Sequence, residues 1–141
     1  MSLPPPPPHQ PSQQPDQQPP GYLRLHLQGN VMVSMITPSV TIDGYPVNVS
    51  YGENTIPVHP GQHLLAAQAQ WMWTYGQAQH PFAVGPGEVA DLWYAPPALT
   101  FMKGAMGPQK QSIPGLVALF GILGGLVLLI LLMVVLLAFL A

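Results

Sequence analysis

The stretch LVALFGILGGLVLLILLMVVLLAFLA, residues 116–141, contains no charged and no polar side chain. As a helix, these 26 residues would rise 1.5 Å each and extend about 39 Å. That length crosses the roughly 30 Å hydrocarbon core of a bilayer with some tilt. A helix in a soluble protein would show a polar face, and this stretch has none. We therefore predict one transmembrane helix over residues 115–141.

The charges that flank this helix lie on its N-terminal side. Lys103 and Lys110 precede it, and no charged residue follows it. The positive-inside rule then places the N-terminal side in the cytoplasm. The first residues contain neither a basic stretch nor an apolar run, so they do not resemble a secretory signal peptide. We expect a single-pass, tail-anchored protein of the cell membrane, with the lipid bilayer as one partner and the N-terminal domain in the cytoplasm.

Small residues in the first half of the helix favour a contact between two helices. Gly121 and Gly125 form a G-x-x-x-G pair, a spacing that lets two backbones approach closely in lipid. Glycine is also common in membrane helices generally. Two explanations therefore remain open, a homodimer formed through this face or a glycine content without a pairing role.

Upstream of the helix, the chain carries little charge. Only 6% of all residues are charged, against about 25% in typical soluble proteins. The charged residues of region 22–96 are Arg24, Asp43, Glu53, Glu88 and Asp91. Without a basic patch, the chain has no surface that would attract the phosphates of nucleic acid, so we predict no nucleic-acid partner. Without cysteine, the sequence has no disulfides and no thiolate metal sites.

Residues 1–21 contain nine prolines and five glutamines, with Asp16 as the only charge. Such a composition cannot bury a core, so we predict a disordered tail with polyproline II character around Pro4 to Pro8. A flexible tail is favoured over a ligand for a proline-binding groove, because no basic residue flanks the run.

Residues 22–96 consist of short alternating apolar runs separated by Gly and Pro turns, which predicts an all-β sandwich. The expected strands cover 22–27, 31–36, 39–43, 46–51, 55–59, 63–75, 79–84 and 88–94. The following residues, 97–114, are rich in Gly and Pro and are expected to be a juxtamembrane linker. Pro114 stands where a helix start tolerates proline.

Three aromatic residues stand at alternate positions of the longest expected strand. Trp71, Trp73 and Tyr75 would share one face of a sheet, because successive side chains of a strand point to opposite sides. They would either pack in the core or form an exposed binding surface for a partner or for the lipid interface. We retain both alternatives.

No pattern in the sequence indicates catalysis. Ser34, Ser39 and Ser50 lack a nucleophile motif, the carboxylates occupy turn-like positions, and no phosphate-binding loop is present. We expect a protein that is not an enzyme and needs no cofactor. His59 and His63 flank a Pro-Gly turn and could meet at a metal. Exposed turn histidines are the favoured interpretation, because no carboxylate or thiolate stands beside them, and no metal site is predicted.

Three segments resemble the PEGA-type domain, a small β-sandwich of envelope-associated bacterial proteins. They are Val40-Thr-Ile-Asp-Gly44, then Asn54-Thr-Ile-Pro-Val-His-Pro-Gly-Gln-His63, and Val84-Gly-Pro-Gly-Glu-Val89. The likeness covers roughly residues 30–94 and departs from the family at Asn54, where the family often has glycine. The arrangement of proline-rich tail, sandwich and terminal helix also resembles small actinobacterial membrane proteins. The resemblance implies a binding or scaffolding module without chemistry of its own.

Two functional hypotheses follow. The first is a cytoplasmic adaptor whose sandwich presents a surface or a sheet edge to an unknown protein partner. The second is an envelope-facing module that binds a glycan or a lipid through Trp71, Trp73 and Tyr75. They predict opposite protease sensitivity of the N-terminal tail in intact and permeabilised cells.

Overall fold

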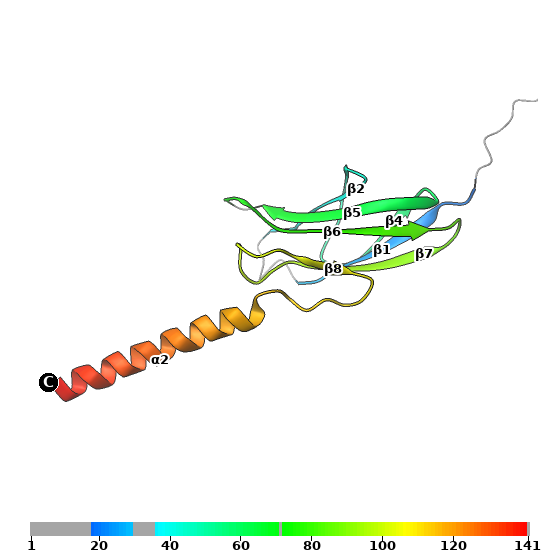
Figure 1. The fold of residues 1–141 in the computed structure, drawn as a ribbon. Coiled ribbons are helices and arrows are strands. Elements are labelled where there is room, and N and C mark those ends of the chain that lie inside the picture. The colour runs from blue at the N-terminus through cyan, green and yellow to red at the C-terminus, as the bar shows by residue number, and fades with distance from the viewer. Residues whose placement is uncertain (1–17, 30–35, 71, 141) are drawn as a thin grey trace, which may run out of the picture.

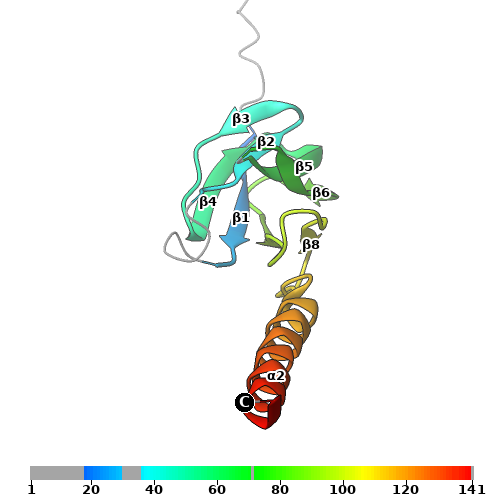
Figure 2. The same ribbon diagram turned by 90° about the vertical axis from the view of Figure 1, so that its left-hand side faces the viewer.

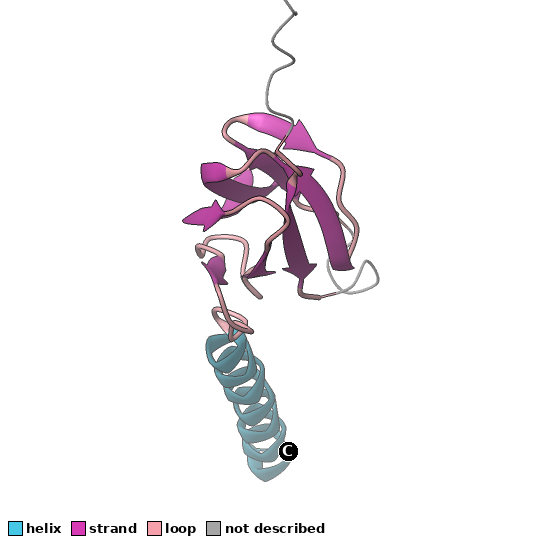
Figure 3. Ribbon diagram, turned by 90° about the vertical axis from the view of Figure 1, so that its right-hand side faces the viewer, coloured by secondary structure: helices cyan, strands magenta, loops and turns pink. Residues whose placement is uncertain are grey.

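The structure is a computed structural model that describes residues 18–29, 36–70 and 72–140. Within these residues it contains two four-stranded β-sheets followed by one long helix (Figure 1, Figure 3). The first sheet has the order β4-β1-β7-β8 and comprises β1 (Gly21–Leu27), β4 (Gly52–Val58), β7 (Val89–Ala95) and β8 (Ala105–Gly107). The second has the order β3-β2-β5-β6 and comprises β2 (Ser39–Ile42), β3 (Tyr45–Val47), β5 (Gly61–Gln70) and β6 (Thr74–Val84).

The two sheets enclose one hydrophobic core (Figure 2). Alternate residues of β1 point into it, as the alternation in the sequence predicts, and each fully buried leucine contributes about 1.5–3 kcal/mol. The buried cluster is formed by Leu23, Leu25, Leu27, Val40, Ile42, Leu65, Ala67, Phe82, Val84, Leu92 and Tyr94. Since both sheets supply members, the predicted β-rich domain followed by an apolar helix is confirmed.

The turn between β2 and β3 is a two-residue hairpin. Asp43 and Gly44 both have positive φ, 52° and 84°. That combination is typical of a type I′ turn, which favours Asp-Gly because few other residues adopt the left-handed region cheaply. The turn fixes the position of the Asp43 carboxylate at this end of the second sheet.

The expected strand over 63–75 is wrong. The chain turns back between Gln70, the last residue of β5, and Thr74, the first residue of β6. These two residues pair with each other, and the register of the β5–β6 ladder shifts between Ala67 and Ala69. The hairpin loop contains neither Gly nor Pro, so the alternation of aromatic residues resembled a continuing strand.

Other strand predictions differ mainly in extent. The strand expected over 46–51 is limited to β3, and the one expected over 79–84 is the second half of the longer β6. Those expected over 22–27, 39–43, 55–59 and 88–94 correspond to β1, β2, β4 and β7. The one expected over 31–36 falls almost wholly outside the described residues, as does most of the predicted tail.

The segment expected to be a linker contributes a strand. β8 pairs with β7 through Trp93 with Gly107, Tyr94 with Met106, and Ala95 with Ala105. Further along, the side-chain amide of Gln28 donates to the carbonyl of Gln111 at 2.9 Å, and the Gln111 amide donates to Gln28 Oε1 at 2.8 Å. A three-residue strand is too short to show alternation, which is why composition alone indicated a linker.

The helix α2 (Leu116–Leu140) has 25 residues, none of them buried. At 1.5 Å per residue it extends about 38 Å. Among the described residues it is the one helix that is long and apolar enough to cross a membrane. A core helix of a soluble protein would be covered by other elements, and α2 projects away from the domain (Figure 1).

Candidate functional site

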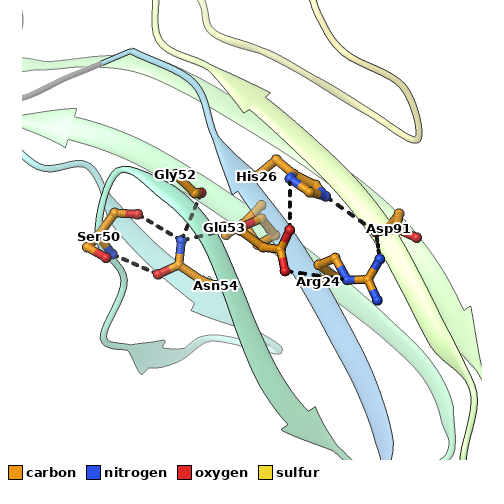
Figure 4. A network of polar contacts seen from close by, with 8 residues as sticks. Arg24, His26, Ser50, Gly52, Glu53, Asn54 and Asp91 are labelled. Atoms are coloured by element: carbon orange, nitrogen blue, oxygen red, sulfur yellow. Dashed lines mark hydrogen bonds and ion pairs between the residues drawn. The ribbon is translucent and has the colours of Figure 1, made fainter.

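A network of charged side chains lies on the outer face of the first sheet (Figure 4). Arg24 and His26 come from β1, Glu53 from β4 and Asp91 from β7. Arg24 Nη1 lies 3.5 Å from Asp91 Oδ1, and Arg24 Nε lies 3.8 Å from Glu53 Oε1. His26 Nε2 lies 3.3 Å from Asp91 Oδ1 and its Nδ1 lies 4.0 Å from Glu53 Oε2. Arg24 is thus flanked by both carboxylates.

The strand register explains this arrangement. In the parallel β1–β7 pair, Arg24 stands opposite Asp91 and His26 opposite Trp93, and in the antiparallel β1–β4 pair His26 stands opposite Glu53. The His26 ring stacks on Trp93 with centroids 4.3 Å apart and planes within 9°. Each charged side chain of the network therefore has a partner within the network. The network lies on the outer face of the sheet, where such ion pairs contribute about 0–1 kcal/mol each.

Asn54 secures the neighbouring turn (Figure 4). Its side-chain amide donates to the carbonyls of Ser50 at 2.7 Å and Gly52 at 3.2 Å, and its Oδ1 accepts from the Ser50 amide at 2.8 Å. The same amide donates to the Leu25 carbonyl of β1 at 3.4 Å. Asn54 therefore shapes the entry into β4 and also joins this turn to β1.

His63 and Asp43 form a close pair at one end of the second sheet. His63 Nδ1 lies 2.6 Å from Asp43 Oδ2, and His63 Nε2 lies 2.7 Å from the carbonyl oxygen of His59. Both ring nitrogens face acceptors, so the doubly protonated ring fits best. The hydrogen bond to Asp43, followed by that to the His59 carbonyl, raises the pKa of His63, and the same His63 contact lowers the pKa of Asp43.

This pair does not have the geometry of a catalytic dyad. A general base needs a free ring nitrogen directed at a substrate, whereas both His63 nitrogens are used within the protein. The same contacts occupy the lone pairs that a metal would require. Among the described residues, no group of three or more His, Asp or Glu is arranged to hold a metal.

A wide hollow of about 980 Å³ lies between the outer face of the second sheet and the chain around β8. We call it the amide groove. Its polar lining comes from Ser39, Thr41, Gln68, Gln77, Gln79 and Gln111. Lys103 is the one charged side chain among the described residues that line it, and none of those residues is aromatic.

The hollow forms because small residues occupy the middle of the sheet face. Across the three strands, Thr41 stands opposite Ala66 and Ala66 opposite Gln79, so the row has a methyl group between two longer side chains. Gly104 forms part of the wall. A Cβ there would lie 2.5 Å from the carbonyl oxygen of Gly76 and 2.7 Å from the Tyr94 ring, so only glycine fits.

The edge of β6 that borders the groove is not part of a β-ladder. β6 pairs with β5 on one side, while on the other side it contacts β8, which belongs to the first sheet. At the start of the strand, the Gly76 amide donates to the Met102 carbonyl at 3.2 Å. The Tyr94 hydroxyl also donates to the Gly76 carbonyl at 2.6 Å, and beyond these bonds the described residues show no β-ladder between β6 and β8.

The predicted aromatic surface is arranged differently from the expectation. Trp73 lies in the β5–β6 hairpin loop, 51% exposed, and Tyr75 is a half-buried residue of β6, so the two do not continue one strand face. Trp71 lies outside the described residues. Trp73 Nε1 donates to the carbonyl of Thr100 at 3.2 Å. Trp73 is thus exposed and Tyr75 half-buried, and their role as a binding surface stays a prediction.

The predicted helix-pairing face remains accessible. A Cβ at Gly121 or Gly125 would have no atom of another element within 4 Å. Because nothing covers this part of α2, the homodimer stays a prediction.

Sequence reasoning missed the amide groove. Glutamine alternates with alanine at the end of β5, in Ala67-Gln68-Ala69-Gln70, and a strand whose outward side chains are polar but uncharged was the available signal. No family model, curated protein or solved structure matches the chain. The PEGA-type resemblance is therefore still a prediction, and the function has to be argued from geometry.

Proposed function

We propose that this chain is a membrane-anchored protein-interaction module without catalytic activity, built on a PEGA-like sandwich, and that the amide groove receives an extended segment of its partner. The observation that carries the proposal is the open groove, lined mostly by amides and hydroxyls, beside the edge of β6 that joins no β-ladder among the described residues. The apolar helix α2 supports anchoring in the cell membrane, with Lys103 and Lys110 favouring a cytoplasmic domain.

The chemistry of the groove suits a peptide backbone. Carboxamides and hydroxyls both donate and accept hydrogen bonds, as backbone amides and carbonyls do. Strand addition at a sheet edge is a common way to bind extended peptides, and the groove borders the edge of β6 that joins no β-ladder among the described residues. The partner segment should carry small or polar side chains and an acidic residue that can meet Lys103.

Cross-linking tests this assignment on the full chain in its membrane. A photo-reactive phenylalanine analogue replaces Gln79 in the groove or, as a matched control, Thr55, an exposed residue of β4 on the other sheet. We expect cross-linked partner from position 79 and not from position 55. The additional substitution Ala66→Trp fills the hollow from the outer face and should abolish the product while leaving the melting temperature nearly unchanged.

Equal cross-linking from both positions, or a product at position 79 that survives Ala66→Trp, would refute the groove as the binding site. An unchanged melting temperature shows that Ala66→Trp does not lose the cross-linked product through unfolding. A synthetic peptide with the cross-linked sequence should then bind the purified full chain and lose affinity with Ala66→Trp.

The alternative of an envelope-facing glycan-binding module is less favoured by the geometry. That alternative binds its ligand through the aromatic residues, and stacking on a sugar ring needs an exposed aromatic face. Trp73 is exposed in the hairpin loop, whereas Tyr75 is half-buried in β6. Protease added to intact and to permeabilised cells separates the two locations. A cytoplasmic domain predicts cleavage of a tagged N-terminal tail only after permeabilisation, whereas cleavage in intact cells would support the envelope-facing alternative.

A further inference from the structure

Three large apolar side chains are exposed at one end of the domain. Met72 is 75% exposed, Trp73 51% and Phe101 77%. Met72 and Trp73 belong to the β5–β6 hairpin loop, and Phe101 to the segment between β7 and β8. We call these three residues the apolar tip. Exposed apolar groups of this size gain free energy when they leave water, at roughly 25 cal/mol per Å².

Hydrogen bonds join the two loops of the apolar tip to each other. Trp73 Nε1 donates to the Thr100 carbonyl at 3.2 Å, and the Gly76 amide donates to the Met102 carbonyl at 3.2 Å. The Met102 amide in turn closes a tight turn with the Leu99 carbonyl at 3.1 Å. The apolar side chains are thus carried on connected backbone.

The same segment is also joined to the start of the helix. The Ala98 amide donates to the Pro114 carbonyl at 2.8 Å. A Cβ at Gly115 would lie 2.5 Å from Met102 Sδ and 3.6 Å from Leu99, so this glycine packs directly on the loop. The hairpin tip, the loop before β8 and the first turn of α2 accordingly lie at one end of the domain (Figure 1).

We propose that the apolar tip inserts into the headgroup–acyl interface of the bilayer that α2 crosses. Tryptophan is favoured at that depth because it combines an apolar ring with a polar N–H, and the phenylalanine and methionine side chains gain free energy on leaving water. Lys103, two residues after Phe101, is exposed and can meet lipid phosphates. The lipid is favoured over another protein because the tip is joined to the first turn of the apolar helix.

The consequence is a second membrane contact beside the helix. A domain joined only by a helix would tilt freely, whereas a domain held at the apolar tip as well keeps one end on the lipid. This inference does not depend on the amide groove, and it holds for either orientation of the protein in the membrane.

Tryptophan fluorescence of the full chain in vesicles tests the proposal. The variant Trp71→Phe/Trp93→Phe retains Trp73 as the single tryptophan, since α2 contains none. The matched control replaces all three tryptophans by phenylalanine and adds Tyr22→Trp, a site of 36% exposure in β1. The blue start of β1 lies at the end of the domain away from α2 (Figure 1). The vesicles contain phosphatidylcholine and phosphatidylglycerol with bromine atoms near the headgroup end of the acyl chains.

We expect the brominated lipid to quench Trp73 severalfold more than the position 22 reporter, and dissolved acrylamide to quench it severalfold less. Adding Phe101→Ser and Met72→Ser to the Trp73 reporter should reduce quenching by lipid. Equal behaviour of the two reporters would overturn the proposal. So would protection of Trp73 from acrylamide without quenching by lipid, because that result indicates cover by a second copy or by another protein.

Discussion

The outer faces of the two sheets differ in how their polar side chains are used. On the first sheet, Arg24 and His26 each lie near both Glu53 and Asp91, so the charged side chains have partners within the same face. On the second sheet, amides and hydroxyls line a hollow around Ala66 and face open space. The comparison suggests that the charged face maintains the sheet surface, while the uncharged face is available to a ligand.

Both faces depend on one core, and disrupting it should have the largest effect. Leu25→Ala removes a fully buried side chain below the charged network, and Leu65→Ala removes one below the amide groove. Each should lower the free energy of unfolding by about 2–5 kcal/mol. Urea unfolding of the full chain in detergent measures this. A loss confined to one of the two variants would mean that the sheets do not share a core.

Gly104→Ala should affect the amide groove and not the charged network, because Gly104 forms part of the groove wall. The added methyl would collide with the Gly76 carbonyl and the Tyr94 ring. We expect a loss of about 1–3 kcal/mol from overpacking, together with loss of cross-linking from position 79. Ser112→Ala, at an exposed position between β8 and α2, is the control. A stable Gly104→Ala variant that retains cross-linking would contradict the role assigned to this wall.

The pair of His63 and Asp43 should make stability depend on pH. The folded-state pKa of His63 is raised, so its contribution is complete below the unfolded pKa of about 6.5 and is lost as pH rises through the folded value. The folded-state pKa of Asp43 is lowered, so its contribution is complete above about 3.9 and is lost as pH falls through the folded value. Stability from the pair is therefore highest between about pH 4 and 6.5.

Thermal unfolding across this pH range checks the prediction. Relative to the wild-type chain, His63→Gln should flatten the decline above the window, and Asp43→Asn should flatten the declines on both sides. An unchanged pH profile in His63→Gln would show that His63 does not titrate as its contacts predict.

The smallest effect is expected from the charged network. Arg24→Gln leaves the neighbouring carboxylates in contact with water, because Glu53 and Asp91 are 59% and 37% exposed. The change in unfolding free energy should stay within about 1 kcal/mol, and cross-linking from position 79 should not change. A large loss of cross-linking would mean that the charged face, and not the amide groove, contacts the partner.

The sequence was sufficient for the elements with long, regular patterns. The alternation of Leu23, Leu25 and Leu27 predicted β1, and the absence of polar residues predicted α2. The amide groove was not predictable, because it depends on Thr41 and Gln79 flanking Ala66, and that register is set by pairing between strands distant in sequence. A regular periodicity can be read from consecutive residues, whereas a hollow depends on which residues lie side by side on neighbouring strands.

The reciprocal amide pair of Gln28 and Gln111 has a mechanical consequence. It ties the end of β1 to the chain between β8 and α2, so tension applied through the helix reaches the Ala98–Pro114 bond first and then this pair and the short β7–β8 ladder. A ladder of three residue pairs can be peeled away while the buried core stays intact. Since Gly104 and Ala105 line the amide groove, a pull on the anchor would open its wall, and the grip on a bound segment would weaken with load.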